Sequence, residues 1–165
     1  MKVQDVMTRT VQFCLPNTDL ALAARLLWEH DCGVLPVVDN NLKVIGVITD
    51  RDICVAAGTR PQAMANLKVG EVLSGKLYTC RPDDDIKGVL EIMKKAQVRR
   101  LPVTEGDGLL HGILSISDVA LCASKPTNAA QPVISYEDIV ETYNAICEPR
   151  AVAAVETGQA RFAVG

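Results

Sequence analysis

Aromatic residues make up only 4% of this 165-residue sequence, so a core must come mainly from Val, Ile, Leu and Ala. Hydrophobic residues account for 48% of the chain, which is enough to build such a core. An excess of basic residues is also missing, because the formal net charge is −3 and Lys and Arg form no long run. A protein that neutralises several phosphates needs a basic face. The composition therefore argues against nucleic acid as the main partner, although it leaves room for a local cationic pocket.

Metal-binding, disulfide and membrane patterns are missing too. The two histidines, His30 and His111, lie far from a ligand-like spacing. No C-x-x-C pair occurs among the six cysteines, which are Cys14, Cys32, Cys54, Cys80, Cys122 and Cys147. The N-terminus lacks the apolar stretch of a signal peptide, and no segment approaches the roughly 20 apolar residues that cross a bilayer. We therefore expect a cytoplasmic chain with free buried thiols, no metal site and no membrane contact.

The usual signatures of catalysis are absent from the sequence. No nucleophile and base, Walker loop or metal-ligand set stands at a diagnostic spacing. We therefore expect no catalytic residue and no enzyme activity.

The sequence repeats itself after 66 positions. Lys2–Ala56 aligns with Lys68–Cys122 without a gap, and Asp52 falls on Asp118. An ungapped match of this length indicates a duplicated fold. We divide the chain into a first repeat at 2–58, a linker at 59–67, a second repeat at 68–123 and a C-terminal extension at 124–165.

Each copy predicts the element order β-α-β-β-α. An extended piece ends at Pro16 or Pro82, and the polar and acidic residues that follow are typical of a helix start. Apolar residues then recur at the spacing of a one-sided helix. Two strands come next, at Val34–Val38 and Val44–Ile48 or at Leu101–Thr104 and Leu110–Leu114, before a helix that begins near Asp50 or Ile116. Because these runs are apolar on both faces, they predict strands covered by helices on each side.

The C-terminal extension predicts one more helix, at about 134–147. Ile139, Tyr143 and Ile146 share one face of it. Residues 124–132 are predicted to form a loop. Residues 148–165 show no clear period, and we expect them to be poorly ordered or packed on a partner.

A local motif, G-h-h-[T/S]-x-x-D, ends the second strand of each copy. It runs from Gly46 through Thr49 to Asp52 in the first copy and from Gly112 through Ser115 to Asp118 in the second. A carboxylate can accept hydrogen bonds from the two hydroxyls of a ribose, and a hydroxyl at a helix start suits phosphate oxygens. The same spacing is also a capping box, which satisfies helix N–H groups without a ligand. Both interpretations stay open at this point.

These tandem units resemble a pair of cystathionine-β-synthase (CBS) domains, known as a Bateman module. The resemblance rests on Leu35-Pro36-Val37, on Leu101-Pro102-Val103 and on the two G-h-h-[T/S]-x-x-D motifs, and it spans residues 2–122. It implies an α+β (α/β) fold, in which two β-α-β-β-α repeats pack by their sheets with pseudo-twofold symmetry. It also implies clefts that bind AMP, ADP, ATP or another adenosyl ligand, regulation without catalysis or a resident cofactor, and a homodimer. The output of such a module would pass through self-association or through a separate partner protein. The alternative is a purely structural or interaction scaffold that binds no nucleotide, in which the motifs serve only as helix caps.

The resemblance also implies a set of ligand-binding residues. Asp52 and Asp118 would hold the ribose hydroxyls. The phosphate end would be lined by Thr49, Ser115, Arg51 and Ser117. The adenine would lie near Val34, Leu35 and Leu101, with neighbours Thr10, Phe13, Leu77 and Thr79 on the first extended pieces.

The two copies differ in charge just before the shared Leu-Pro pair. The second copy carries Arg99 and Arg100, where the first has Gly33 and Val34. Two adjacent arginines could clamp a phosphate, or could be a solvated pair at a helix-to-strand turn. On the first interpretation the two clefts are not equivalent, and the one at Asp118 is the better phosphate site.

Overall fold

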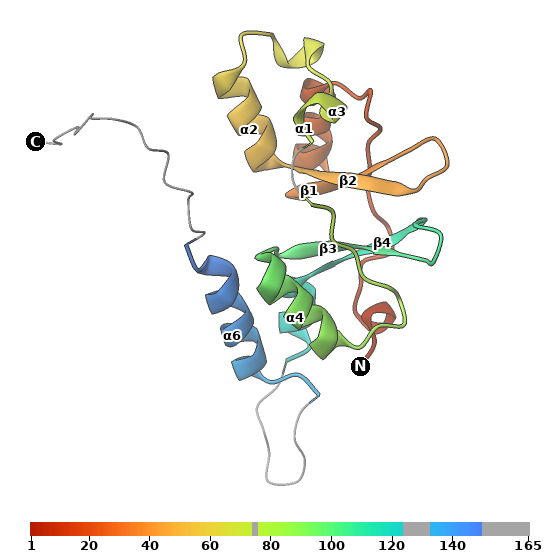
Figure 1. Ribbon diagram of the computed structural model, residues 1–165, viewed down its shortest axis with the longest axis vertical. Helices are drawn as coiled ribbons and strands as arrows, with labels where there is room; N and C mark the ends of the chain where they lie inside the picture. The colour runs from red at the N-terminus through yellow and green to blue at the C-terminus, as the bar shows by residue number, and fades with distance from the viewer. Residues whose placement is uncertain (74–75, 124–132, 150–165) are drawn as a thin grey trace, which may run out of the picture.

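Two antiparallel β-hairpins, one from each repeat, form the centre of the computed structural model, which describes residues 1–73, 76–123 and 133–149 (Figure 1). The first pairs β1 (Val34–Val38) with β2 (Val44–Thr49), and the second pairs β3 (Arg100–Thr104) with β4 (Leu110–Ser115). Their registers are equivalent, with Val34 opposite Thr49 and Arg100 opposite Ser115. The predicted duplication and the predicted strands are confirmed to within one residue.

The helices begin where the sequence places their caps. The Asp19 side chain accepts a hydrogen bond from the backbone N–H of Leu22 at 2.8 Å, and Asp85 accepts one from Lys87 at 3.0 Å. Besides these two long helices, each repeat has a short lead segment and a helix after its second strand. The helical elements are η1 (Val3–Asp5), α1 (Leu20–Glu29), α2 (Asp50–Thr59), η2 (Met64–Asn66), α3 (Val69–Val72), α4 (Ile86–Ala96), α5 (Ile116–Leu121) and α6 (Tyr136–Cys147).

The predicted first strand of each repeat is reduced to a single residue that pairs in parallel. Cys14 bridges Val37 and Cys80 bridges Val103. The N–H of Cys14 donates to the Pro36 carbonyl at 3.0 Å, and its carbonyl accepts from Val38 at 3.0 Å. The flanking residues make no further ladder with β1 or β3 among the described residues. The expected first strand of each repeat is therefore a single bridge at the β1 or β3 edge of its hairpin.

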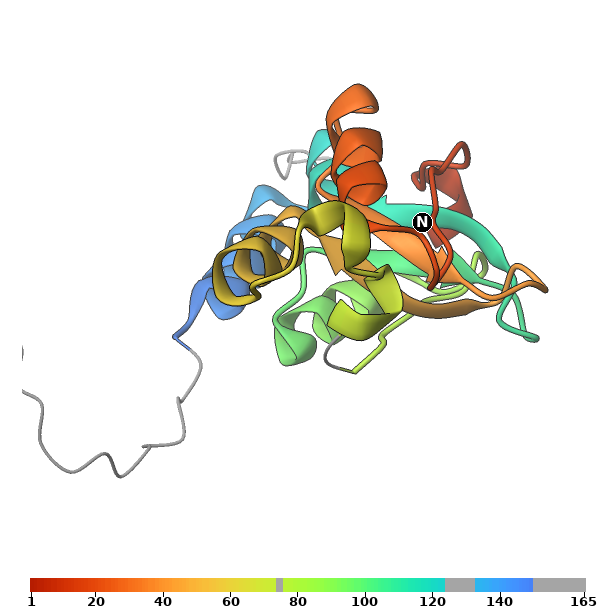
Figure 2. The same ribbon diagram turned by 90° about the horizontal axis from the view of Figure 1, so that it is seen from above.

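Helices cover only one side of each hairpin, so the expectation of helices on both sides is wrong. The two hairpins face each other, with α1, α2 and α3 outside the first and α4 and α6 outside the second (Figures 1 and 2). Their tips are joined by hydrogen bonds of 3.0 Å from Val44 N–H to the Gly108 carbonyl and 3.1 Å from Leu110 N–H to the Leu42 carbonyl. The second apolar face of each hairpin is therefore directed toward the other repeat.

The lead segments are exchanged between the repeats. Val3 and Met7 belong to the core that surrounds β3 and β4, whereas Leu67 and Val69 belong to the core that surrounds β1 and β2. Lys2 bridges Asp85 in the second repeat, and Lys68 bridges Asp19 in the first. Each core is thus completed by a segment that precedes the other repeat, which ties the two copies into one unit with pseudo-twofold symmetry.

The glycine of each repeated motif accommodates this exchange. A Cβ atom on Gly112 would lie 2.7 Å from the Thr8 carbonyl oxygen and 3.1 Å from Met7 Sδ, and a Cβ on Gly46 would lie 3.2 Å from the Leu73 side chain. The backbone N–H of Thr8 donates to the Ile113 carbonyl at 2.9 Å, and Ile113 N–H donates back to Thr8 at 2.9 Å. A side chain at Gly112 would therefore break the pairing of the lead segment with β4.

We expect Gly112→Ala to lower the free energy of unfolding by about 1–3 kcal/mol, because the new methyl group meets a backbone atom that cannot move cheaply. The matched control is Gly88→Ala, since Gly88 lies in α4 with nothing within 4 Å of an added Cβ. The control should stabilise the protein by up to about 1 kcal/mol. Urea unfolding measures both, and a Gly112→Ala midpoint equal to that of the wild type would contradict the close approach.

The cysteines divide by burial, and the expected buried thiols are found only at the two strand-edge positions. Burial raises the pKa of Cys14 to about 11 and that of Cys80 to about 12. Cys32 is half-buried, and the remaining three, Cys54, Cys122 and Cys147, are exposed.

In a thiol titration of the native protein at pH 8, Cys54, Cys122 and Cys147 should react rapidly. Cys14 and Cys80 should react only after denaturation, because they are buried and stay protonated to well above this pH. Peptide mapping of the labelled protein identifies the sites. Rapid labelling of Cys14 or Cys80 without denaturant would show that the hairpin edges open readily.

The C-terminal helix is confirmed as α6, and it lies beside α4 (Figure 1). Ile139 is buried, and Tyr143 and Ile146 pack against the core of the second repeat, as the apolar face predicted. The predicted loop at 124–132 and the last stretch from 150 onward lie outside the described residues. Within the described part of the chain, no helix is long and apolar enough to cross a membrane.

Candidate functional site

The two repeated motifs form capping boxes at the starts of α2 and α5. Ser115 donates its backbone N–H and its hydroxyl to Asp118 Oδ2, both at 2.8 Å, and Asp118 N–H donates to Ser115 Oγ at 3.1 Å. Thr49 and Asp52 make the same three contacts at 2.9, 2.7 and 3.2 Å. The capping interpretation of the motif is therefore correct in both repeats.

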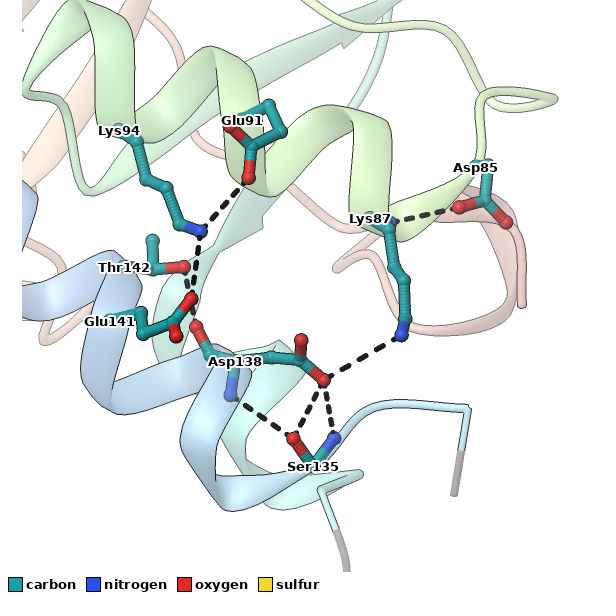
Figure 3. Close-up of polar contacts among 8 residues, drawn as sticks. All are labelled: Asp85, Lys87, Glu91, Lys94, Ser135, Asp138, Glu141 and Thr142. Carbon is teal, nitrogen blue, oxygen red and sulfur yellow. Dashed lines mark hydrogen bonds and ion pairs between the residues drawn. The ribbon is translucent and has the colours of Figure 1, made fainter. Parts of the chain in front are cut away.

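A third capping box outside the repeats shows what the motif does on its own. Ser135 donates its backbone N–H and hydroxyl to Asp138 Oδ2, both at 2.8 Å, at the start of α6 (Figure 3). These hydrogen bonds, led by that from the backbone N–H, hold the pKa of the Asp138 carboxyl below its usual range. The capping boxes at Asp52, Asp118 and Asp138 share one geometry. A role in ligand binding must therefore come from the residues that surround a box.

Each motif carboxylate uses one oxygen for the cap. No donor among the described residues contacts Oδ1 of Asp118 or of Asp52, so this oxygen is available to a ligand. The hydroxyl hydrogens of Thr49 and Ser115 are already donated to Asp52 and Asp118. A phosphate could accept a hydrogen bond from either hydroxyl only by displacing the cap, so the predicted phosphate contacts of Thr49 and Ser115 conflict with it.

A cleft of about 370 Å³ surrounds the second motif and is lined by both repeats. The first repeat contributes the extended segment after its lead helix and the junction between α1 and β1. The second repeat contributes the start of β3, the end of β4 and the cap of α5. The lining residues are Thr8, Thr10, Val11, Gln12, His30, Asp31, Cys32, Gly33, Val34, Arg100, Ile113, Ser115 and Asp118.

The cleft combines apolar and charged lining residues. Val11, Val34 and Ile113 are apolar, whereas Asp118 and Arg100 carry opposite charges, and Arg100 lies opposite Ser115 in the register of β3 and β4. The Arg100 guanidinium lies against Gly33, since its Nη1 would be 3.4 Å from a Cβ atom there. Arg100 makes no side-chain hydrogen bond or ion pair with any residue that the structure describes. A half-buried cation with unused donors suits an anionic group of a ligand.

The structure brings together only part of the predicted site. Thr10, Val34, Arg100, Ser115 and Asp118 line the cleft. Arg99 and Ser117 are exposed and lie outside its lining, so the expected clamp of two arginines is reduced to one. Arg99 and Ser117 are the exposed sequence neighbours of Arg100 and Asp118, in agreement with the rule that adjacent residues of an extended or helical segment project to different sides.

The remaining predicted residues lie in other places. Leu35 and Leu101 are 0% and 1% exposed and belong to the two cores, so their side chains do not reach the cleft. Phe13 borders a small depression of about 120 Å³ beside the hairpin tips. Leu77 and Thr79 are half-buried on the second extended segment, outside the lining of the cleft.

Asp52 and Arg51 border a separate cavity of about 390 Å³. Its other lining residues come from α2, the linker and α3, and they are Val55, Ala56, Thr59, Arg60 and Val72. The described residues around the two motifs therefore differ, and the predicted inequivalence of the two clefts toward phosphate stays a prediction.

Sequence reasoning missed several lining residues. Thr8 reaches the cleft only because its backbone pairs with Ile113 in the other repeat, which no local pattern reveals. Asp31, Cys32 and Gly33 form the turn between α1 and β1. Burial raises the pKa of Cys32, and it outweighs the backbone hydrogen bond with Val34 and the Arg100 charge, which both lower it. The 66-residue offset maps Gly33 of this turn onto Arg99, which was already a predicted site residue in the second repeat. That correspondence could have identified the turn as part of the site.

Comparison with known proteins agrees with this architecture. The CBS domain family matches residues 3–58 and 69–124. Hypoxic response protein 1 of Mycobacterium tuberculosis is 32% identical over 153 residues, which cover 91% of this chain and 96% of that protein.

Two solved structures share the fold. The crystal structure of Hypoxic Response Protein I with two coordinated zinc ions has a TM-score of 0.69 and 28% identity, over 75% of this chain and all of that one. The structure of CBSX2, a CBS-pair protein from Arabidopsis thaliana, in complex with AMP has a TM-score of 0.63 and 27% identity, over 73% and 93% of the two chains. Two interlocked repeats, each with the capped glycine motif, and two matches to one family lead to one conclusion: this chain belongs to the CBS domain family, as a tandem pair of CBS domains.

Proposed function

We propose that the chain is a non-catalytic regulatory module that binds an adenine nucleotide in the cleft at Asp118. The observation that carries the proposal is the position of this capping box. The Asp118 carboxylate keeps one free oxygen at the edge of a cleft that both repeats build. The third box, at Asp138, borders a smaller cavity of about 240 Å³, whose other lining residues all belong to α4.

The lining offers a place for each part of a nucleotide. The adenine would lie against Val11, Val34 and Ile113, and the ribose hydroxyls would donate to Asp118 Oδ1. Phosphate oxygens would accept from Arg100, with His30 as a second nearby donor. A volume of about 370 Å³ lies within the usual range for small-molecule sites.

The relatives support this class of ligand. CBSX2, at 27% identity, was solved in complex with AMP. Hypoxic Response Protein I was solved with two coordinated zinc ions, which makes zinc the competing ligand. In the part of the chain that the structure describes, no three His, Cys, Asp or Glu side chains are grouped to hold a metal ion.

The signal would pass through self-association or through a separate cytoplasmic protein, because the proposed module has no chemistry of its own. A scaffold without a ligand is the second candidate. The capping boxes favour it, since they explain Thr49, Asp52, Ser115 and Asp118 without a nucleotide.

Thermal-shift titrations with AMP, ADP, ATP, adenosine, S-adenosylmethionine and zinc chloride separate the candidates. A ligand at a hundredfold excess over its Kd stabilises the fold by about 2.7 kcal/mol. We expect a saturable increase in the melting temperature with at least one adenine nucleotide. A response to zinc alone, or to none of the six, would favour the other candidates, and native mass spectrometry of freshly purified protein would identify a co-purified ligand.

A further inference from the structure

An open groove lies between α1 and α2 on the outer side of the first repeat. It has a volume of about 520 Å³, and its lining from the two helices is mainly small or apolar, with Ala24, Leu27 and Ala57 among the residues. Trp28 also lines the groove, and 87% of its surface is exposed. The groove therefore offers an exposed aromatic ring beside an apolar surface, which suits a flat group of a ligand.

The groove adjoins the cleft at Asp118. Their common boundary consists of Asp31, Cys32, Gly33 and Arg100, since these four residues line both cavities. Gly33 adds no side chain to this boundary, and a Cβ atom there would lie 3.4 Å from Arg100 Nη1. The guanidinium from the second repeat therefore reaches the boundary itself. A phosphate bound by Arg100 in the cleft would lie where the groove begins.

Apart from Arg100, the charged residues that line the groove are acidic. They are Asp31 and Asp50, and Arg100 is the only cation among the described lining residues. A chain of phosphates that extended from Arg100 into the groove would meet these two carboxylates. The carboxylates would instead attract a cation, and a positively charged planar ring on Trp28 would also gain a cation–π contact. The group that enters the groove must therefore be flat and uncharged or positively charged.

In the second repeat α6 covers the equivalent surface (Figure 1). The 66-residue offset maps Trp28 onto Lys94, whose Nζ lies 3.5 Å from Glu141 of α6. The offset also maps Asp31 onto Gln97, whose side chain donates to two backbone carbonyls at the end of α6, at 3.2 and 2.9 Å. A ligand could therefore extend from a cleft into such a groove only on the side of the first repeat.

We propose that the groove is a second subsite for the ligand of the Asp118 cleft, and that this ligand is an adenine dinucleotide whose second ring is a cation. The adenosine half would occupy the cleft, and the pyrophosphate would cross the boundary at Gly33 and accept hydrogen bonds from Arg100. The cationic ring would stack on Trp28. Oxidised nicotinamide adenine dinucleotide (NAD⁺) has this chemistry, whereas the nicotinamide ring of the reduced form, NADH, is uncharged. The inference rests on the nucleotide site proposed above, and it gives that site a preference for the oxidised dinucleotide.

Isothermal titration calorimetry of the full-length protein with NAD⁺, NADH and AMP tests the proposal. The wild type should bind one NAD⁺ at least about 10-fold more tightly than AMP, because a stacked base contributes about this factor to affinity. It should also bind NAD⁺ more tightly than NADH, whose ring lacks the positive charge. Trp28→Ala should remove the difference between NAD⁺ and AMP, and Trp28→Phe should restore most of it. The control is Leu121→Ala, at an apolar residue of α5 that is 89% exposed and lines neither cavity, and it should keep the wild-type preference.

The outcomes separate the subsite from the cleft. If AMP binds and NAD⁺ binds no more tightly, or if Trp28→Ala keeps the preference for NAD⁺, the subsite is overturned and the nucleotide site stands. An affinity for NADH equal to that for NAD⁺ would overturn the cationic ring. If none of the three ligands binds, the nucleotide site is overturned and the subsite with it.

A second measurement needs no variant, because Trp28 is the only tryptophan of the chain. NAD⁺ should quench its fluorescence in a saturable way, with the same Kd as in calorimetry, since the ring stacks directly on the indole. AMP should saturate the cleft with a much smaller change in emission. Quenching by NAD⁺ that rises linearly without saturation, as in random collisions with an exposed indole, would overturn the proposal even if Trp28→Ala failed to fold.

Discussion

Asp118→Asn should weaken AMP binding by about 10- to 100-fold while leaving the protein folded. Hydrogen bonds to a charged partner contribute about 1.5–3 kcal/mol, and each 1.4 kcal/mol corresponds to a tenfold change in Kd. Asp118 lines the cleft and its Oδ1 has no donor among the described residues, so in the proposed complex the ribose hydroxyls would lose their charged acceptor. Isothermal titration calorimetry with AMP measures the change.

Asp138→Asn is the matched control for this prediction. Asp138 makes the same capping box, but at the start of α6, outside the cleft (Figure 3). Both substitutions should cost similar stability, because each alters one helix cap, a change worth about 0.5–2 kcal/mol. The control also loses its contact with Lys87, but exposed ion pairs contribute little. If both variants lost AMP affinity equally, the effect would come from helix capping, and Asp118 would have no direct contact with the ligand.

Arg100→Ala should weaken the binding of ATP and AMP by about 10- to 100-fold and the binding of adenosine by much less. The guanidinium lies in the cleft wall against Gly33 with its donors unused by described residues, so a phosphate would gain charge-assisted hydrogen bonds there. Arg99→Ala is the control, since Arg99 is exposed outside the lining. Competition assays with the three ligands on both variants provide the comparison.

The distribution of effects between the arginines decides whether the clamp has one member or two. If Arg99→Ala and Arg100→Ala lowered the ATP affinity equally, the result would support the clamp of two arginines that the sequence suggests. It would contradict the lining of the cleft, which includes Arg100 and not Arg99. If Arg100→Ala lowered the affinities for adenosine and for ATP equally, Arg100 would shape the cleft and would not bind phosphate.

The repeat made most of the fold predictable from the sequence. Local patterns that occur twice predict the strands, the helix starts and the helix caps at Asp19 and Asp85. Each copy therefore supports the interpretation of the other. The exchange of lead segments was not predictable, because Val3 packs beside residues that lie far along the chain. Local periodicity shows which face of a segment is apolar, and it does not show which partner covers that face.

Part of the candidate site was predictable, from the motif, from the difference between the copies and from the family resemblance. Asp118 and Ser115 stand in the motif, and Arg100 was found by comparing the copies. The family resemblance implied that Leu35 and Leu101 lie near the adenine, but strand neighbours alternate between faces, and these two side chains belong to the cores. The contribution of Thr8 depends on pairing between repeats.

A nitrogen-15 NMR titration with AMP tests the central claim most directly, since it reports on the backbone amides one by one. We predict that the largest shifts fall on Thr10, Val11 and Gln12, on the turn from Cys32 to Val34, and on Ile113, Ser115 and Asp118, so that both repeats respond to one ligand. No shift at millimolar AMP, or shifts confined to residues outside this cleft, would contradict the account.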